Sequence, residues 1–291
     1  MATTTATYKR TSKLSMSQPQ DNSHGSSSVT SSEPQILMPE QEALYREVLI
    51  ALEERKVPYT VSGAFALREY TGICRMTKDL DLFLTAEDSV EALQYLQKKG
   101  FNCEVCDPVW LSKAHRDGYF VDLITGMSNA ALVVDPLWIQ RSRPATIVDI
   151  KTRVLAPEEL LSSKLFVTRR ERFDGADIAH VIYGTHGQIE WNRVLELIGE
   201  HWEMLLWAFL FFRYSYPAQT DYVPAWLWRD LLGRFSSAIA GDNKDAPFRG
   251  SLVDDNMFAI DLQDWGMANI LEDYRAQRLS RIKKTTQNQC V

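Results

Sequence analysis

The chain has 291 residues, of which 45% are hydrophobic and 24% are charged, and its formal net charge at pH 7 is −6. This length and composition are those of a globular protein that buries a sizeable core in one large or two modest domains. The acidic balance argues against broad non-specific binding to nucleic acids, although it leaves room for a local basic groove.

The first 34 residues are dominated by hydroxyl side chains, with 15 Ser or Thr among them and few apolar residues. Such a segment cannot bury enough apolar surface to fold, so residues 1–35 are predicted to form a disordered tail. Its basic start, with Lys9, Arg10 and Lys13, loosely resembles a transit peptide. It lacks an amphipathic arginine-rich helix, and we therefore favour a plain disordered tail.

From residue 36 to residue 156, helical and strand patterns alternate. Apolar residues at helical spacing and N-cap signals predict helices over 40–56, 63–72 and 85–99. Short apolar runs predict strands over 59–62, 79–84, 101–106 and 119–124, followed by one bent or two short strands over 147–150 and 153–155.

After Pro157 the strand patterns stop, and helices are predicted over 158–172, 176–183, 190–212 and 225–235. Strands mixed with helices, followed by helices alone, predict an α/β (α+β) fold with a small mixed β-sheet and a C-terminal helical region. The expected organisation is a sheet-containing domain over 36–156, a helical domain over 157–240, and a loop with a C-terminal helix or tail over 241–291.

Two further features limit the class of protein. The most apolar run, 204–212, is far shorter than the ~20 residues that span a bilayer, so a buried helix is expected and no membrane partner. Four cysteines are too few for a disulfide scaffold, so a cytoplasmic location is expected. Cys103 and Cys106 have the spacing of a zinc or redox pair, but no second pair lies near, and a structural role is preferred.

Two aspartates in one strand are the strongest chemical signal. Asp79 and Asp81 stand two apart, so both carboxylates leave the same face of the strand, while Leu80 and Leu82 point toward a core. Two acids this close repel each other unless a cation lies between them, and a hard divalent ion is the natural occupant. Asp122, a single acid in another apolar strand, would complete a platform for two metal ions.

Other segments offer groups that bind phosphate. Ser62-Gly63 lies where a strand enters a helix, and backbone N–H groups at a helix start can hold a phosphate, although such a glycine is more often a simple turn. Lys164 can meet a triphosphate as a point charge. For the arginine cluster over 169–172, a solvated face with ion pairs is the preferred interpretation.

In this order, the segments resemble the nucleotidyltransferase superfamily typified by DNA polymerase beta: a strand, a glycine-containing helix start, an Asp-x-Asp strand and a third Asp on a later strand. The chain is most similar to bacterial uncharacterised nucleotidyltransferase-family proteins, and more distantly to abortive-infection nucleotidyltransferase toxins. Where the superfamily has Gly-Gly or Gly-Ser, this chain has Ser62-Gly63. The resemblance spans about residues 40–270, through the phrases Ser62–Leu67, Tyr70–Arg75, Thr77–Phe83 and Asp174–Asp177.

The resemblance implies a metal-dependent nucleotidyltransferase that transfers a nucleoside monophosphate from a nucleoside triphosphate, ATP among the candidates, and releases pyrophosphate. It implies that Asp79, Asp81 and Asp122 are catalytic and bind Mg²⁺ or Mn²⁺. It further implies that the nucleotide is bound by Ser62, Gly63, Arg75 and Lys164. The acceptor stays open: a small molecule, a protein and an RNA are all compatible.

Two alternatives from other classes remain. The chain could be a catalytically inactive regulator that binds nucleotide and metal, although the three aspartates argue against a decayed site. It could also be a protein-interaction module, because its helical half is rich in aromatic residues, including Trp191, Trp202, Trp207 and Trp226. Aromatic residues at helical spacing usually form a core, so we prefer the enzyme.

Overall fold

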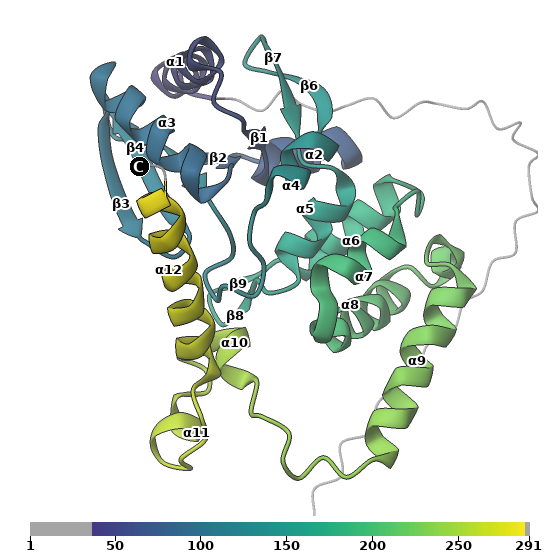
Figure 1. Cartoon of the computed structure of the whole chain (residues 1–291). Coiled ribbons are helices and arrows are strands. Elements are labelled where there is room, and N and C mark those ends of the chain that lie inside the picture. Colours follow the sequence, from purple (N-terminus) through teal and green to yellow (C-terminus); the bar gives the residue numbers. More distant parts are fainter. Residues whose placement is uncertain (1–36, 289–291) are drawn as a thin grey trace, which may run out of the picture. The chain divides into compact units, whose positions relative to one another are not determined.

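The computed structural model describes residues 37–288, so the predicted tail over 1–35 lies outside the described residues. A mixed seven-stranded sheet carries the fold, in the order β3-β4-β5-β2-β1-β7-β6 (Figure 1). Its strands are β1 (Thr60–Val61), β2 (Asp79–Phe83), β3 (Asn102–Asp107), β4 (Leu111–Arg116), β5 (Tyr119–Ile124), β6 (Arg143–Ile147) and β7 (Ile150–Val154). The predicted α/β fold with a small mixed sheet is thus confirmed.

Helices precede, connect and follow the strands. Those within the sheet-containing part are α1 (Pro39–Arg55), α2 (Gly63–Thr71), α3 (Ala86–Lys98) and α4 (Pro136–Arg141). Those after it are α5 (Pro157–Lys164), α6 (Gly175–Gly184), α7 (Trp191–Ile198), α8 (Trp202–Ser215), α9 (Ala225–Ala240), α10 (Gly250–Asp254), α11 (Ala259–Gln263) and α12 (Ile270–Asn288), with short 3₁₀ turns η1 (Gly199–His201) and η2 (Pro217–Tyr222). The predicted domain boundaries at 156 and 240 remain predictions.

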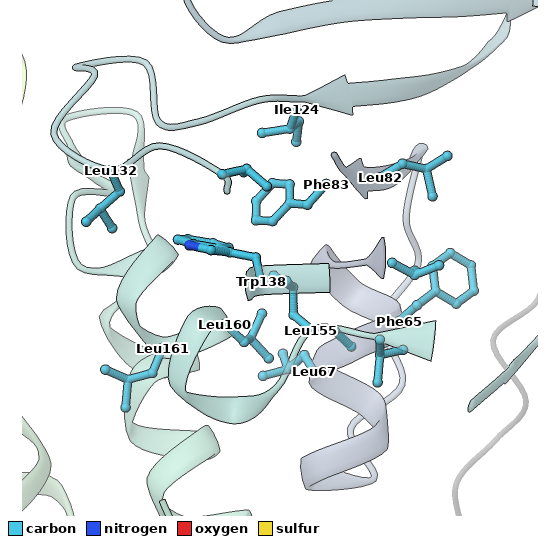
Figure 2. Close-up of a cluster of buried hydrophobic side chains, with 14 of the residues drawn as sticks. Phe65, Leu67, Leu82, Phe83, Ile124, Leu132, Trp138, Leu155, Leu160 and Leu161 are labelled. Carbon is cyan, nitrogen blue, oxygen red and sulfur yellow. The ribbon is translucent and has the colours of Figure 1, made fainter. Parts of the chain in front are cut away.

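The core that supports the centre of the sheet is built from strand and helix residues together. Figure 2 shows Phe83 from β2 facing Trp138 from α4, and their ring centroids are 5.9 Å apart. Leu82, Leu67 and Leu160, from β2, α2 and α5, are fully buried in the same cluster. Each such side chain stabilises the fold by roughly 1.5–3 kcal/mol through apolar burial. The elements that carry the predicted site residues are therefore held rigidly.

One predicted helix, over 158–172, is wrong in its second half. The helix α5 ends at Lys164, and the chain continues into a two-stranded hairpin, β8 (Thr168–Arg169) and β9 (Arg172–Phe173). The arginine-rich segment favours a helix locally, but the backbone N–H of Arg170 bonds to Asp254 Oδ2 at 3.2 Å. That contact with a residue 84 positions away exists only in the folded chain, so tertiary structure overrides local propensity here.

Two other boundaries differ from the prediction. The expected helix over 190–212 is divided into α7 and α8 at Gly199, whose φ of +51° ends α7. The predicted strand over 147–150 is interrupted: Ile147 ends β6, Ile150 begins β7, and Val148 and Asp149, both with positive φ, form the hairpin turn between them. Within residues 37–288, no helix is both long enough and apolar enough to cross a bilayer.

Candidate active site

The three aspartates converge because of the strand register. β2 and β5 are parallel neighbours, and Asp81 lies opposite Asp122 in their pairing. Asp79 precedes Asp81 by two residues and so leaves the same face of the sheet. Carboxylate oxygens of all three lie within 4.8 Å of one another. The structure therefore brings together the acids that the sequence selects as a metal-binding set.

The aspartate cluster carries more negative charge than its neighbours neutralise. Burial, reinforced by the charges of Asp79 and Asp122, raises the pKa of Asp81 to about 7. Burial also raises the pKa of Asp122, although a hydrogen bond from Lys113 Nζ, 2.6 Å from Asp122 Oδ1, opposes this. The donor set consists of carboxylate oxygens alone, without thiolate or imidazole. These residues fit Mg²⁺ or Mn²⁺, the hard cations that prefer oxygen ligands.

This charge balance predicts how the stability of the metal-free protein depends on pH. The folded pKa of Asp81 lies above the ordinary value of 3.8, so the folded state binds more protons than the unfolded state between pH 3.8 and about 7. Stability from this group is therefore present at low pH and is lost as pH rises through 7. We expect the melting temperature of wild type, in EDTA, to fall relative to that of Asp81→Asn between pH 5 and pH 8. Parallel pH profiles for the two proteins would contradict the assignment.

Gly63 allows the cluster and the start of α2 to approach each other. Its φ is +59°, and a Cβ atom placed on it would lie 2.0 Å from Asp81 Oδ2. The preceding residue, Ser62, is buried, and its backbone N–H donates to the Asp81 carbonyl at 2.8 Å. Glycine is thus required at this position for two reasons: the backbone is left-handed, and the Asp81 carboxylate lies where a Cβ atom would be.

Replacing Gly63 with Ala is expected to displace the Asp81 carboxylate as well as strain the backbone. The positive φ alone costs a non-glycine residue about 1–2 kcal/mol. Gly72→Ala is the matched control, because Gly72 has a φ of +68° but a Cβ atom there would meet no other atom within 4 Å. Both variants should lose stability in thermal melts, but only Gly63→Ala should lose stabilisation by metal and nucleotide. An intact ligand response in Gly63→Ala would refute the role of this contact.

Lys113 contacts the aspartate cluster, and the sequence analysis did not select it. It lies on β4, opposite Asp122 in the β4–β5 pairing, and its Nζ is 3.8 Å from the ring centroid of Phe120. The pattern of β4 is weak because its inward residues are the small Ser112 and Ala114 rather than large apolar ones. The turn signal Asp117-Gly118 could have indicated the strand that carries Lys113, because a two-residue hairpin turn requires a strand on each side.

The predicted nucleotide-binding residues have different surroundings. Lys164 is buried at the end of α5, with its Nζ 2.9 Å from Asp174 Oδ2 and 2.7 Å from Asp177 Oδ2. It also lines the cavity that contains the three aspartates, as do Ser62 and Gly63. Arg75 instead pairs with Asp177 and is not among the cavity-lining residues. The structure therefore brings Lys164, Ser62 and Gly63 to the aspartates, but not Arg75.

Arg172 belongs to the site as well, on its open side. Its side chain is 67% exposed, forms an ion pair with Asp174 at 3.1 Å, and lines the same cavity. Burial alone would raise the pKa of Asp174, but the charges of Lys164 and Arg172 and their hydrogen bonds hold it below its ordinary value. Arg169 lines the cavity too. The preferred interpretation of this cluster as a solvated face is thus incomplete, because two of its arginines border the site.

The cavity joins a charged end to an apolar end. Its volume is about 290 Å³, and it lies between the sheet and the segment from α5 to β9. At the charged end are the aspartates, Lys164 and Arg172. The other walls are supplied by Phe83, Trp110, Ile124, Met127, Phe166 and Val167. Such a combination suits a ligand with an anionic head and a flat, mostly apolar body.

Comparison with known proteins places this geometry in a family. A family model described as uncharacterised nucleotidyltransferase matches residues 40–211, a range that includes the three aspartates. No curated protein matches the chain. Among solved structures, an antigenic nucleotidyltransferase-like protein from Paracoccidioides brasiliensis is 18% identical, with a TM-score of 0.40 over 65% of this chain and 94% of that one. The antibiotic-resistance factor ANT(2″)-Ia is 16% identical, with a TM-score of 0.42 over 57% of this chain and 94% of that one.

Proposed function

The chain belongs to the family of uncharacterised nucleotidyltransferases, and from that membership we propose that it transfers a nucleoside monophosphate from a nucleoside triphosphate to an acceptor hydroxyl, with release of pyrophosphate. The observation that carries the proposal is the convergence of Asp79, Asp81 and Asp122 within 4.8 Å, in a cavity that also has an apolar end. Family membership makes the chain a nucleotidyl-transfer enzyme. The divalent metal, the acceptor and the fate of pyrophosphate are the parts we propose.

The three aspartates would hold Mg²⁺ or Mn²⁺, which when bound supplies Lewis-acid activation and neutralises charge on the phosphates. In the transfer, the acceptor oxygen forms a bond to the α-phosphorus, and the bond from that phosphorus to the bridging oxygen of the β-phosphate breaks. Asp122, on the strand beside β2, accepts the acceptor proton. Lys113, 2.6 Å from Asp122, holds that carboxylate in position.

The β- and γ-phosphates are assigned to the start of α2 and to the basic side chains. Gly63 leaves the first N–H groups of this nine-residue helix accessible to an anion, and the helix dipole favours negative charge there. Lys164 has three donors, of which two bond to Asp174 and Asp177, so one remains for phosphate. Arg75 then acts indirectly, by pairing with Asp177 and so positioning Lys164.

The nucleobase is assigned to the apolar end of the cavity. Trp110 and Phe166 are aromatic lining residues against which a base can stack. Such stacking suits any purine or pyrimidine ring. Trp110 is fixed by the bond from its Nε1 to Asp107 Oδ2 at 3.1 Å. ATP is included among the donors to be tested.

We keep the cytoplasm as the proposed compartment, because Cys74, Cys103 and Cys106 are free thiols.

A thermal-shift titration tests the proposal without knowledge of the acceptor. Wild type, Asp81→Asn and Asp242→Asn are melted with ATP, GTP, CTP or UTP, each with and without Mg²⁺ or Mn²⁺. Asp242 is the matched control, since its side chain is 73% exposed and its ion pair is with the exposed Lys244. A ligand at 100 times its dissociation constant stabilises by about 2.7 kcal/mol. We expect a metal-dependent shift in wild type and Asp242→Asn and none in Asp81→Asn.

Two results would count against the proposal. If no nucleotide shifts the melting temperature of wild type with either metal, the proposed binding site for the nucleotide donor is refuted. A metal-dependent shift without any pyrophosphate release, across a broad set of hydroxyl acceptors, would favour the inactive nucleotide-binding regulator instead. The ion pair between Lys113 and Asp122 is the observation that keeps this second candidate in view, because it places a cation on the proposed general base.

A further inference from the structure

The β8–β9 hairpin presents different side chains on its two faces. Thr168 pairs with Phe173, and Arg169 pairs with Arg172. Residues opposite each other in an antiparallel pair share a face, and successive residues alternate, so the two pairs point to opposite sides. Arg169 and Arg172 line the cavity of the aspartates, whereas Thr168 and Phe173 line a second cavity. The hairpin therefore lies between two neighbouring cavities, and Arg169 borders both.

The second cavity is apolar and aromatic. It has a volume of about 410 Å³, and Phe173 and Trp207, which line it, have ring centroids 5.5 Å apart. Both side chains are partly open to solvent, at 47% and 42% exposure, as is Met257 at 44%. A Cβ atom on Gly175 would lie 2.1 Å from Phe173 Cζ, so this glycine is what allows the ring its position. Exposed aromatic surface gathered in a concavity is typical of a binding site.

The charged side chains that line this cavity are positive. Arg169 and Arg170 are exposed side chains that border it, and no Asp or Glu is among the described residues that line it. The backbone of Arg170 is fixed by its bond to the buried carboxylate of Asp254. A positive, aromatic cavity favours a ligand with negative charge and disfavours a polycation, which the two guanidinium groups would repel.

We propose that the second cavity binds the acceptor, and that the acceptor is an aromatic or similarly flat apolar molecule that carries both a hydroxyl group and an anionic group. The inference rests on the proposed nucleotidyl transfer and names its substrate class. The acceptor hydroxyl reaches the aspartates past Arg169, the residue common to both cavities. Its oxygen bonds to the α-phosphorus, its proton passes to Asp122, and pyrophosphate leaves with the electron pair of the broken P–O bond.

Binding of two matched probes tests the proposal. One is a hydroxynaphthalene sulfonate, and the other is a hydroxynaphthalene methylammonium with the same ring and hydroxyl positions, so that only the charge differs. Calorimetric titration is carried out on wild type, Trp207→Ala, Met257→Asp and Met267→Asp. Met267 is the matched control for Met257, because both side chains are 44% exposed but only Met257 lines the cavity.

The expected result is binding of the sulfonate at least about tenfold more tightly than of the ammonium, a difference of about 1.4 kcal/mol. Trp207→Ala and Met257→Asp should each weaken sulfonate binding by about tenfold, while Met267→Asp should not. Equal affinity for both probes, no binding of the sulfonate, or full sulfonate binding in Trp207→Ala and Met257→Asp would each overturn the proposal. A failure of the proposed function would give a different result. In that case the nucleotide-dependent thermal shift of wild type would be absent, whether or not the probes bind.

Discussion

Asp81→Asn is expected to lower the rate of nucleotidyl transfer by at least about 10³-fold, which corresponds to about 4 kcal/mol of transition-state stabilisation. Asp81 lies at the centre of the aspartate cluster, opposite Asp122 and two residues after Asp79. The amide that replaces its carboxylate has one neutral oxygen and brings two N–H donors toward a cation, so metal is bound weakly and in altered geometry. Release of pyrophosphate from the nucleotide identified by thermal shift measures the effect.

The same substitution should not harm the fold, which separates a catalytic defect from an unfolded protein. Asp81 has a pKa raised to about 7 by burial and by its acidic neighbours, so its charged form destabilises the metal-free protein. Asp81→Asn should therefore melt at least as high as wild type at pH 8 in EDTA. Activity of Asp81→Asn close to that of wild type, or to that of the exposed control Asp242→Asn, would refute the assignment of the metal site.

The second large effect concerns stability. Lys164→Met is expected to destabilise the protein by about 3 kcal/mol, because two buried carboxylates lose the ammonium that they share and each keeps a single arginine partner, Arg172 for Asp174 and Arg75 for Asp177. Lys164, Asp174 and Asp177 are all less than 10% exposed, and the ammonium lies 2.9 and 2.7 Å from the two carboxylates. Urea-induced unfolding, followed by tryptophan fluorescence, measures the change. Nucleotide affinity, measured in the same variant, should also fall, because one donor of the ammonium is assigned to phosphate.

Two companions make this result interpretable. Lys244→Met, in which the side chain replaced is 87% exposed, should change stability by less than about 1 kcal/mol. Adding Asp177→Asn to Lys164→Met should restore part of the lost stability, because it removes a buried carboxylate whose remaining partner, Arg75, is 42% exposed and is solvated without it. If Lys164→Met is as stable as wild type, the buried ion-pair cluster does not hold α5 to α6, and Lys164 would be an ordinary nucleotide contact.

Much of the sheet-containing part of the fold could be predicted from the sequence because its signals are local. The period of two places Asp79 and Asp81 on one face of β2, and the apolar runs around them mark buried strands. Thr85 is recognisable as a helix cap, and its Oγ1 indeed accepts from the Asp88 N–H. The pairing of β2 with β5, which brings Asp122 opposite Asp81, joins segments about 40 residues apart. The sequence marks Asp122 only as a lone acid in an apolar strand, and the resemblance to a known superfamily is what groups it with the first two acids.

The rest depends on contacts that local patterns do not contain. Lys113 lies on a strand with small inward residues, so its apolar alternation is weak. The residues of the hairpin after α5 favour a helix by composition. They form a strand pair only in the folded chain, where the backbone N–H of Arg170 in the hairpin turn donates to the Asp254 carboxylate. A helix over this segment would place Arg169 and Arg172 differently, so neither their position at the cavity nor the second cavity follows from the sequence.

Anomalous diffraction from crystals grown with Mn²⁺ and a non-hydrolysable nucleoside triphosphate analogue tests the central claim most directly. We expect a manganese peak in contact with carboxylate oxygens of Asp79, Asp81 and Asp122, with the triphosphate between that peak and the start of α2 at Gly63. A nucleotide bound elsewhere, or manganese absent from the three aspartates while the nucleotide occupies the cavity, would contradict it.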